Sequence, residues 1–379
     1  MSLRKCALLM LAALMMSLPA TGEALPTPEP LVPLRSAHIR AVGDVMVHAR
    51  QLEIAAQPDG SYDFHPQFAL IADSLAGADY TIANLETTIG KYHDMDYSGY
   101  PLFNSPESLL DAVKDAGVDF LTLANNHILD RYFDGMRATV DHVEAAGFDF
   151  GGANRSPEEQ ARPNVVEVNG IAIGFICCTQ MTNTMENYCD PAAVEYGVNY
   201  IKDVRIDDAV RKLRDAGAEV IIAIPHWGEE YFRQPEEQVV IWARRMVSAG
   251  VDVVLGSHPH MVQPVRFVTA QTADGDTRTG LVAYCLGNFL SDMSVQYTDS
   301  GIILDFTIQE RQEGGFSIEN VGVVPVFCWR RDDMVQPVSS LKYYDHRPEG
   351  MSDSRYSRMK ESYRELKKLL GDAVAYLPE

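Results

Sequence analysis

Five times along this sequence, a helix-like segment ends in Ala-Gly and is followed directly by an apolar run. Glycine just past a helix adopts a left-handed conformation that side chains resist, so each joint predicts a helix end that leads into a strand. Repeated alternation of helices and strands is typical of an α/β domain with parallel or mixed sheets. The glycines of these joints are Gly77, Gly117, Gly147, Gly217 and Gly250.

The alternation extends from His38 to about Asp292. The predicted helices are Phe68–Gly77, Pro106–Gly117, Asp134–Gly147, Asp203–Gly217 and Gln234–Gly250. The stretch Met181–Tyr200 has no clear period and is long enough to be a functional loop. Later segments predict a hairpin turn, two antiparallel strands and a charged amphipathic helix, at Gln271–Thr279, Gly301–Gln309, Phe316–Val326 and from Met351 to about Leu370.

The N-terminus resembles an export signal. Arg4 and Lys5 precede an apolar stretch that ends at Leu18, and small residues around Ala24 suit cleavage. The stretch is shorter than the roughly 20 residues that a spanning helix needs, although an uncleaved anchor is the alternative. We therefore expect an exported protein, extracellular or membrane-associated, with a signal peptide (1–24), a proline-rich linker (25–37), one domain (38–330) and a C-terminal helical extension packed on it (331–379).

The composition excludes some partners. The formal net charge of −21 argues against nucleic acid and against broad adsorption to anionic lipid. Beyond the leader the chain has five cysteines, an odd number without metal-finger spacing, which is not a disulfide framework. Cys177, Cys285 and Cys328 lie in strand-like runs and are expected in the core, and a bridge from Cys177 or Cys178 to Cys189 is left open.

Polar residues follow most of the predicted strands. Strand ends in an α/β sheet lie along one edge, where such folds build their sites. The run that ends at Phe150-Gly151-Gly152 is the exception, because it carries no such group. The polar strand ends are Gly43-Asp44, Asn84-Leu85-Glu86, Asn125-Asn126-His127, His226-Trp227-Gly228-Glu229 and His258-Pro259-His260.

These side chains form a ligand set of carboxylates, an amide and imidazoles. Such a set suits Zn, Mn or Fe without thiolate ligands, and paired metals of this kind usually serve phosphoester hydrolysis. For His226 the alternative is a hydrogen-bonded structural histidine, and for the Asn125-Asn126 turn it is a helix cap. The predicted metal ligands are Asp44, Glu86, Asn126, His226, His258 and His260.

Three of the polar residues are candidates for acid–base catalysis, namely His127, Asp44 and Glu86. Others are expected to support the site. Trp227 would wall a pocket, and Glu229 or Glu230 would orient an imidazole. The remaining supporting candidates are His48, Asn125, Asp130 and Asn288.

Six stretches, taken together and in this order, resemble the CapA/PgsA-type capsule synthesis family, which is associated with poly-γ-glutamate production. They cover about His38 to Asp292. The resemblance implies an α/β fold of the calcineurin-like metallophosphoesterase type, a four-layer sandwich of two mixed β-sheets flanked by helices. The matching stretches are Gly43–Met46, Asn84–Glu86, Ala124–Asp130, His226–Tyr231, Gly256–His260 and Gly287–Phe289.

On that resemblance, metal-ligand positions fall on Asp44, Asn126, His226, His258 and His260, and the catalytic histidine falls on His127. Three departures stand out. A classical phosphoesterase begins with Asp-x-His, whereas His48 is four residues from Asp44 here. Asn84-Leu85-Glu86 replaces the motif of the bridging aspartate, and Ile128 replaces the acidic residue after the Asn-His pair. We therefore expect one or two divalent ions, with a metal-free acid–base set as the alternative.

Three functions follow from these observations. The first is an exported hydrolase-like enzyme of capsule or cell-envelope polymer synthesis, which acts on a phosphoester or at a γ-glutamyl bond. The second is a non-enzymatic accessory subunit that holds an anionic polymer within a membrane capsule-synthesis complex, which would need a local basic groove. The third is a metal-independent acid–base enzyme acting on peptide.

Overall fold

The computed structural model of the 379-residue chain describes residues 34–91, 96–202 and 204–377. The expected signal peptide and most of the expected linker, up to residue 33, lie outside the described residues. Strand β1 begins at Ser36, so the last residues of that linker belong to a sheet. Within the described part of the chain, no helix is both long and apolar enough to cross a membrane.

A nine-stranded mixed sheet, called sheet A, contains the first strand of the domain. Strands β1, β2, β5 and β6 of this sheet are parallel to one another. The pairs β1–β14, β14–β15 and β15–β16 are antiparallel. In spatial order the strands are β16 (Met334–Ser339), β15 (Phe316–Arg331), β14 (Ser300–Glu310), β1 (Ser36–Val45), β2 (Tyr80–Leu85), β5 (Phe120–Thr122) and β6 (Asp149–Gly151), with β13 (Asn288–Leu290) on β1 and β17 (Ala375–Tyr376) on β15.

A six-stranded mixed sheet, called sheet B, is parallel in its middle and has an antiparallel hairpin strand at each edge. The hairpin turn predicted at Gln271–Thr279 is confirmed, because it joins β11 to β12. The strands are β11 (Val265–Gln271), β12 (Thr277–Ala283), β10 (Val253–Leu255), β9 (Val220–His226), β8 (Ile171–Thr179) and β7 (Val165–Val168); β3 (Thr88–Ile89) and β4 (Asn104–Ser105) form a small separate pair.

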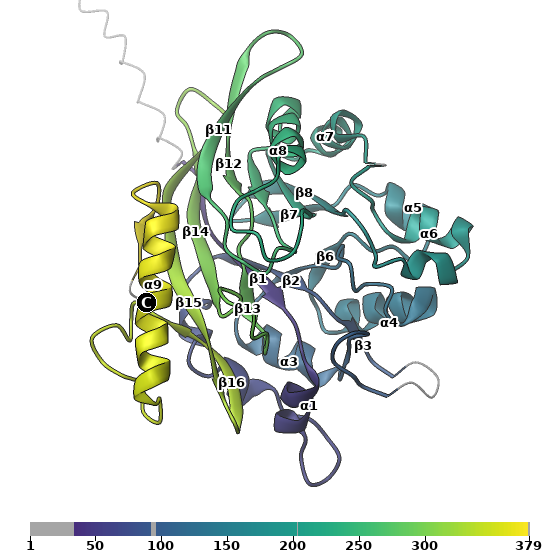
Figure 1. Cartoon of the computed structure of the whole chain (residues 1–379). Helices are drawn as coiled ribbons and strands as arrows, with labels where there is room; N and C mark the ends of the chain where they lie inside the picture. The colour runs from purple at the N-terminus through teal and green to yellow at the C-terminus, as the bar shows by residue number, and fades with distance from the viewer. Residues whose placement is uncertain (1–33, 92–95, 203, 378–379) are drawn as a thin grey trace, which may run out of the picture. The chain divides into compact units, whose positions relative to one another are not determined.

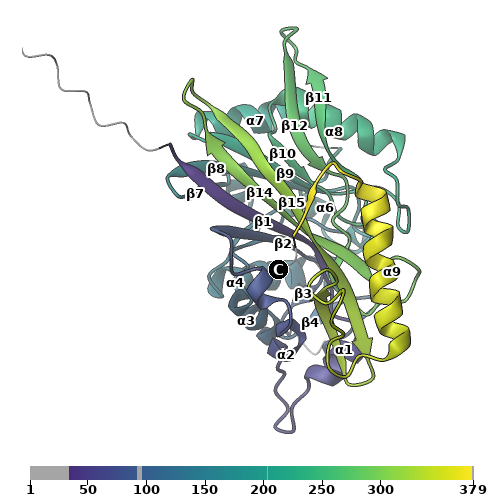
Figure 2. The same ribbon diagram turned by 90° about the vertical axis from the view of Figure 1, so that its left-hand side faces the viewer.

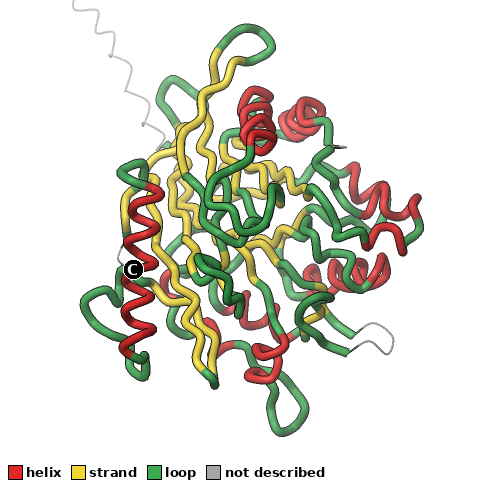
Figure 3. Tube along the Cα trace, in the orientation of Figure 1, coloured by secondary structure: helices red, strands yellow, loops and turns green. Residues whose placement is uncertain are grey.

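Helices cover the outer faces of both sheets (Figure 1, Figure 3). Helices α3 and α4 pack on sheet A, and α7 and α8 pack on sheet B. This is the four-layer α/β arrangement that was predicted. The helices are α1 (Ala49–Ala55), α2 (His65–Phe68), η1 (Ala72–Ser74), α3 (Ser108–Asp115), α4 (Tyr132–Ala145), α5 (Pro157–Ala161), η2 (Met185–Tyr188), α6 (Pro191–Gly197), α7 (Ile206–Asp215), α8 (Glu237–Ala249) and α9 (Asp353–Leu370).

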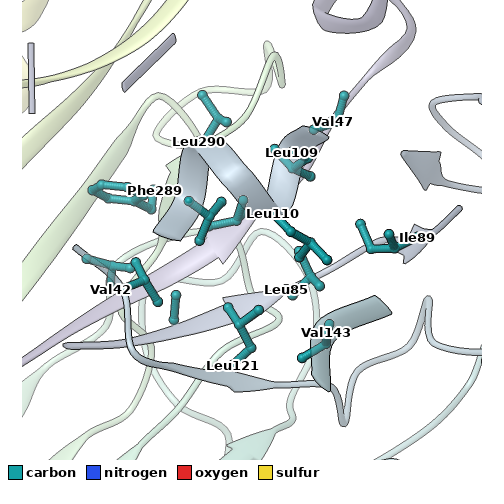
Figure 4. Packing of buried hydrophobic residues seen from close by; sticks show 14 of the residues in the cluster. Val42, Val47, Leu85, Ile89, Leu109, Leu110, Leu121, Val143, Phe289 and Leu290 are labelled. Atoms are coloured by element: carbon teal, nitrogen blue, oxygen red, sulfur yellow. The ribbon is translucent and has the colours of Figure 1, made fainter. Parts of the chain in front are cut away.

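The alternation of side chains along β1 explains how the layers stack. Ala37, Ile39 and Ala41 face a central core that also contains residues of sheet B. Val42 belongs instead to the outer core of sheet A, part of which Figure 4 shows, and so does Val45, which lies beyond a register shift between Ala41 and Asp44. Because strand side chains point alternately to opposite faces, one strand contributes to two cores. Sheet A is thus buried on both faces.

Four of the five Ala-Gly joints have the predicted geometry. Gly117, Gly147, Gly217 and Gly250 follow α3, α4, α7 and α8 with positive φ angles between 75° and 116°. The prediction for the first joint is wrong, because α2 and η1 replace the helix expected at Phe68–Gly77. The buried Arg40 guanidinium lies against this segment and donates to the Ser74 carbonyl at 2.6 Å.

The C-terminal part adds to sheet A before it forms a helix. The antiparallel pair predicted from Gly301 onwards is confirmed as β14 and β15, and α9 matches the predicted amphipathic helix. Strand β16 lies beyond the expected domain boundary at 330 and pairs with β15, so sheet A continues into the expected extension (Figure 2). The expected loop from Met181 to Tyr200 contains η2 and α6.

Candidate metal and acid–base site

The ends of parallel strands from both sheets bring the predicted residues together. Asp44 lies near the end of β1, and Glu86 follows β2. His226 is the last residue of β9, and His258 and His260 follow β10. All five side chains are buried. The predicted convergence at one edge therefore includes both sheets.

Three overlapping groups of side chains have ligand atoms within 4.8 Å of one another. The first contains Glu86, His226 and His258, and the second contains Asp44, Glu86 and His260. The third contains Glu230, His258 and His260. Because Glu86 belongs to two groups, one carboxylate lies between two sets of donors.

The Asn84 amide links the two buried carboxylates. Its Nδ2 donates to Asp44 Oδ1 at 2.8 Å and to Glu86 Oε2 at 3.3 Å. Among the described residues Glu86 Oε1 has no hydrogen-bond partner, and it lies 3.6 Å from His226 Nε2 and 3.8 Å from His260 Nε2. Burial, and then the charge of Asp44, raise the pKa of Glu86 well above its ordinary value.

The orientation of His260 leaves one ring nitrogen free to bind a ligand. Its Nδ1 lies 3.0 Å from Asp44 Oδ2 and 3.2 Å from Asn288 Oδ1, both of which accept hydrogen bonds. Nδ1 therefore carries the proton, and Nε2 offers its lone pair on the side of Glu86. A carboxylate that holds a histidine in this way is the usual second partner of a metal-ligating imidazole.

His226 and His258 are held as neutral imidazoles. His226 Nε2 lies 2.9 Å from Asn126 Oδ1, and its Nδ1 lies 2.8 Å from Ser257 Oγ, a hydroxyl that can donate or accept. Burial, followed by the other histidines, lowers the pKa of His226 well below its usual value and that of His258 to about 3. Nδ1 of His258 has no partner, and its backbone has a φ of 97°.

The donors fit a divalent cation. Buried polar atoms are normally hydrogen-bonded, yet Glu86 Oε1 and His258 Nδ1 are both unpartnered within the donor groups. Two buried carboxylates beside neutral imidazoles also leave negative charge for a cation to balance. Carboxylate oxygen and imidazole nitrogen are ligands that zinc, manganese and iron accept.

His127 lies outside the three donor groups and has a different partner. Its Nδ1 is 2.7 Å from Asp130 Oδ2, which also accepts from the Phe103 backbone N–H at 2.6 Å. The Phe103 ring packs edge-on against the imidazole at 4.7 Å between centroids. Asn125 accepts from the His127 backbone N–H, so the turn itself is fixed. This arrangement suits an acid–base histidine held by a carboxylate.

Three predicted supporting residues lie outside the donor groups. His48 is at the start of α1, where its Nδ1 is 3.3 Å from Gln51 Oε1, and its ring meets the Phe103 ring edge-on at 5.2 Å, so it borders the His127 side of the site. Trp227 is wholly buried, donates to the Tyr284 carbonyl and packs in the core beneath α8, so it does not wall a pocket. Glu229 is exposed, and its neighbour Glu230 is the carboxylate that joins a donor group.

Sequence reasoning missed three contributors, Asn84, Ser257 and Phe103. Asn84 was identifiable, because residues two apart on a strand face the same side and Glu86 follows at that spacing. The contact of Ser257 with His226 depends on an isolated bridge between the ends of two strands, and no local pattern signals it. Phe103 comes from a loop with no polar motif.

A separate cavity of about 740 Å³ lies between β6, β8 and α7. Phe150, Phe175, Cys177 and Tyr200 are among its lining residues. It shares no residue with the three donor groups, so it is separate from the metal and acid–base site.

All five cysteines of the described chain are free, and Cys177, Cys285 and Cys328 are buried as predicted.

Residues 38–293 match a family described as bacterial capsule synthesis protein PGA_cap. The chain belongs to this family. The match covers the strand ends that carry the donor groups and His127, and it stops at the loop before β14. The resemblance found in the sequence is thereby confirmed.

Curated relatives of this capsule synthesis family are distant in sequence. The capsule biosynthesis protein CapA of Bacillus anthracis is 24% identical over 276 residues, which are 71% of this chain and 63% of that protein. The PGA biosynthesis protein CapA of Bacillus subtilis is 24% identical over 291 residues, 74% and 70% of the two chains. A probable polyglutamine synthesis accessory protein of Mycobacterium tuberculosis is 27% identical over 206 residues, 49% and 51%. The chain thus spans less than two thirds of the B. anthracis relative.

Solved structures with some similarity include the NAD nucleotidase NadN of Haemophilus influenzae, with 10% identity and a TM-score of 0.44, over 91% of this chain and 58% of that one. Another is the calcineurin-like phosphoesterase YfkN of Bacillus subtilis, with 14% identity and a TM-score of 0.41, over 89% and 99%. The four-layer fold is established independently of them, by the strand order and the helix positions given above.

Proposed function

We propose that this chain is a metal-dependent hydrolase of capsule, poly-γ-glutamate or related cell-envelope polymer synthesis, with a phosphoester as its substrate bond. The observation that carries the proposal is Glu86 Oε1, which is buried, unpartnered and shared by two donor groups. Asn84 bonds only the other oxygen of this carboxylate, so Oε1 is left as the atom that would hold a divalent ion.

Five side chains would hold the metal, Asp44, Glu86, His226, His258 and His260. When bound, a Zn, Mn or Fe ion supplies Lewis-acid activation of water and of a phosphoryl oxygen. Asn126 would fix or join this shell through its contact with His226.

His127 would move the proton. Its Nδ1 is held at Asp130, so its Nε2 is the atom that would donate to the leaving oxygen of a bound substrate. The Asp130 carboxylate would stabilise the charged imidazole while that proton is in transit. A histidine in this role contributes roughly 100- to 10,000-fold to the rate.

Two variants test this proposal. Glu86→Gln should lose at least about 90% of the bound transition metal in elemental analysis and should hydrolyse bis(p-nitrophenyl) phosphate at least about 100-fold more slowly. His127→Asn should keep its metal while hydrolysis falls by about 100-fold or more. Glu229→Gln, an exposed change in the same loop as Glu230, is the control and should match the wild type. Wild-type protein that binds no transition metal would refute the proposal.

A metal-independent acid–base enzyme acting on a γ-glutamyl peptide is the second candidate. The observation in its favour is the His127–Asp130 pair, which is complete without any ion. Activity on oligo-γ-glutamate that survives a chelator and is lost in His127→Asn would favour it over the hydrolase.

A non-enzymatic accessory role is the third candidate, and the similarity to a probable polyglutamine synthesis accessory protein of Mycobacterium tuberculosis favours it. Such a role needs a local basic groove, and six arginines close to the motifs in sequence are its candidates. They lie on separate elements, since Arg131 is buried just before α4, Arg137 lies on α4, Arg244 and Arg245 lie on α8, Arg266 lies on β11, and Arg233 lies over the Tyr297 ring. Complementation of a capsule-deficient strain by the Glu86→Gln protein would support the accessory role.

We propose that the protein is exported and that its signal peptide is cleaved after Ala24. N-terminal sequencing of the protein purified from its own cell would check this cleavage.

A further inference from the structure

Exposed apolar side chains are concentrated beside the candidate site. The described chain has ten large hydrophobic side chains that are strongly exposed, and five of them lie on three short segments next to the site. Such clustering marks a surface that binds something, because exposed apolar groups are otherwise scattered singly. The five are Tyr100, Leu102, Tyr132, Tyr231 and Phe232.

Tyr100 is presented by a rigid loop. The backbone groups of Ser98 and Asn104 bond each other in both directions, at 2.9 and 2.8 Å, and close the loop beneath it. The Tyr100 ring meets the edge of Phe103 at 6.3 Å, and Phe103 in turn packs on His127. The side chain is 77% exposed, so its ring face is available beside the acid–base histidine.

Tyr231 lies beside His260, a member of two donor groups. Its backbone has a φ of 70° and its N–H donates to the Pro259 carbonyl, so its direction is imposed by the loop that carries the histidines. The ring is 6.4 Å from that of His260 and remains 41% exposed. Burial and a hydrogen bond with Glu230 raise the pKa of Tyr231, and the charges of Tyr100 and Glu86 raise it further.

Few cations lie among the described residues near these tyrosines. The segments 96–105, 131–133 and 229–233 contain two, Arg131 and Arg233, and the exposed Lys91 lies over the Tyr97 ring at 5.3 Å. Arg131 is buried and bonded to the Asp130 carbonyl and Ser98, and Arg233 lies over the Tyr297 ring and donates to the Glu365 carbonyl. Glu230 offers only hydrogen-bond acceptors when ionised. A matching ligand is an uncharged ring with apolar faces and several hydroxyl donors.

We propose that Tyr100 and Tyr231 form a stacking subsite for an uncharged sugar ring of the substrate, whose hydroxyls donate to Glu230. The sugar's C–H faces lie against the aromatic rings, and its substituent reaches the buried donors. This inference rests on the proposed hydrolase function, because it assigns the part of the substrate that the metal and acid–base site does not bind.

The test measures sugar binding to the full chain by saturation-transfer NMR and titration calorimetry. The probes are the uncharged trisaccharides of glucose and of N-acetylglucosamine, with oligo-γ-glutamate and adenosine as competing classes. Saturable binding of at least one trisaccharide is expected. Failure of both trisaccharides to bind up to about 20 mM, or saturable binding of a competing class that the tyrosine variants abolish, would overturn the proposal.

The variants separate stacking from hydrogen bonding. Tyr100→Ala and Tyr231→Ala should each weaken trisaccharide binding about tenfold, whereas Tyr100→Phe and Tyr231→Phe should stay within about threefold because the rings remain. Phe267→Ala removes a ring that is 49% exposed on β11 and should have no effect. Equal binding by wild type and both alanine variants would contradict the subsite.

Metal analysis distinguishes this inference from the function on which it rests. Neither tyrosine belongs to a donor group, so all four tyrosine variants should keep the wild-type metal content. Trisaccharide binding that depends on the tyrosines in a chain without metal would leave the subsite standing and remove the hydrolase. Metal binding without trisaccharide binding would do the reverse.

Discussion

The buried carboxylates and histidines were predictable because each one ends a strand. Asp44, Glu86, His226, His258 and His260 converge as the strand-end rule requires. Details that depend on turn geometry were not predictable. The left-handed backbone of Gly228 and Tyr231 brings Glu230 to the donors and leaves Glu229 in solvent.

Trp227 shows a residue-level error that the sequence could have prevented. Its neighbour His226 points toward the donor groups at the end of β9. Adjacent residues in extended chain point to opposite sides, so Trp227 faces the helix layer, where it stacks on Trp242 with ring centroids 6.4 Å apart. The period of two along the strand therefore predicts that Trp227 lies in the core and not in a pocket wall.

His48 gives a prediction about acid stability. Burial lowers its folded-state pKa to about 4, whereas an unfolded histidine titrates near 6.5. The unfolded state therefore binds more protons as the pH falls from about 7 to 4, and the folded state loses stability across that window. Relative to His48→Gln, the wild type should lose on the order of 2–3 kcal/mol of unfolding free energy between these pH values.

Urea unfolding at several pH values between 4.5 and 7.5 would measure this difference. The exposed His346 provides the matched control, and His346→Gln should run parallel to the wild type. A difference between wild type and His48→Gln that does not change with pH would show that His48 is protonated without penalty.

Among the elements, α9 has an influence that reaches the site. Arg358 forms two 2.9 Å bonds with the Asp299 carboxylate, next to Thr298. The Thr298 carbonyl accepts from Asn288 Nδ2 at 3.0 Å, and Asn288 Oδ1 is a partner of His260. The helix thus fixes the loop that holds Asn288, and through it the ring of a metal-binding candidate.

Arg358→Met should therefore weaken both stability and metal binding. Loss of a paired, largely buried guanidinium leaves Asp299 without its partner, which costs about 1–3 kcal/mol of unfolding free energy. Zinc affinity, measured by competition with a chromogenic chelator, should fall severalfold because His260 loses its fixed orientation. The paired control is Arg347→Met, whose exposed ion pair with Asp353 contributes less than about 1 kcal/mol. Unchanged zinc affinity in Arg358→Met would break this chain of contacts.

Helix prediction succeeded where a glycine ends the helix. The four confirmed helices are followed by glycines with positive φ, a local signal. Helix α6 has a different local signal, since Asp190 caps it and Pro191 begins it. The segment before Gly77 ends in a glycine too but forms α2 and η1, and the Ser74 carbonyl there bonds to Arg40, which is distant in sequence.

At the scale of the whole molecule, the two sheets share one central core. Ile39 of sheet A and Ile222 of sheet B are both fully buried in it. Neither sheet can expose its inner face without exposing the other. The strand order of a sheet depends on long-range pairing that no local sequence pattern encodes. The two-sheet arrangement could therefore be predicted only through the resemblance to a known family.

Ile39→Ala and Ile222→Ala should each destabilise the described domain by about 2–5 kcal/mol, through lost transfer energy and a residual cavity. Both variants should unfold in a single calorimetric transition at a lower midpoint, because the two sheets unfold together. Ile241→Ala, at a half-exposed position on α8, should change the midpoint little. Two separate transitions in either core variant would show that the sheets are independent units.

The pairing of β1 with β14 has a consequence for how far the folding unit extends. The family match ends at residue 293, yet β14 begins at Ser300 and runs antiparallel along β1 from Ser36 to Val42. A fragment cut at the end of the match would leave β1 with a free, apolar edge in the middle of the molecule. Unpaired strands of that kind recruit one another, so such a fragment would aggregate before it could bind a metal.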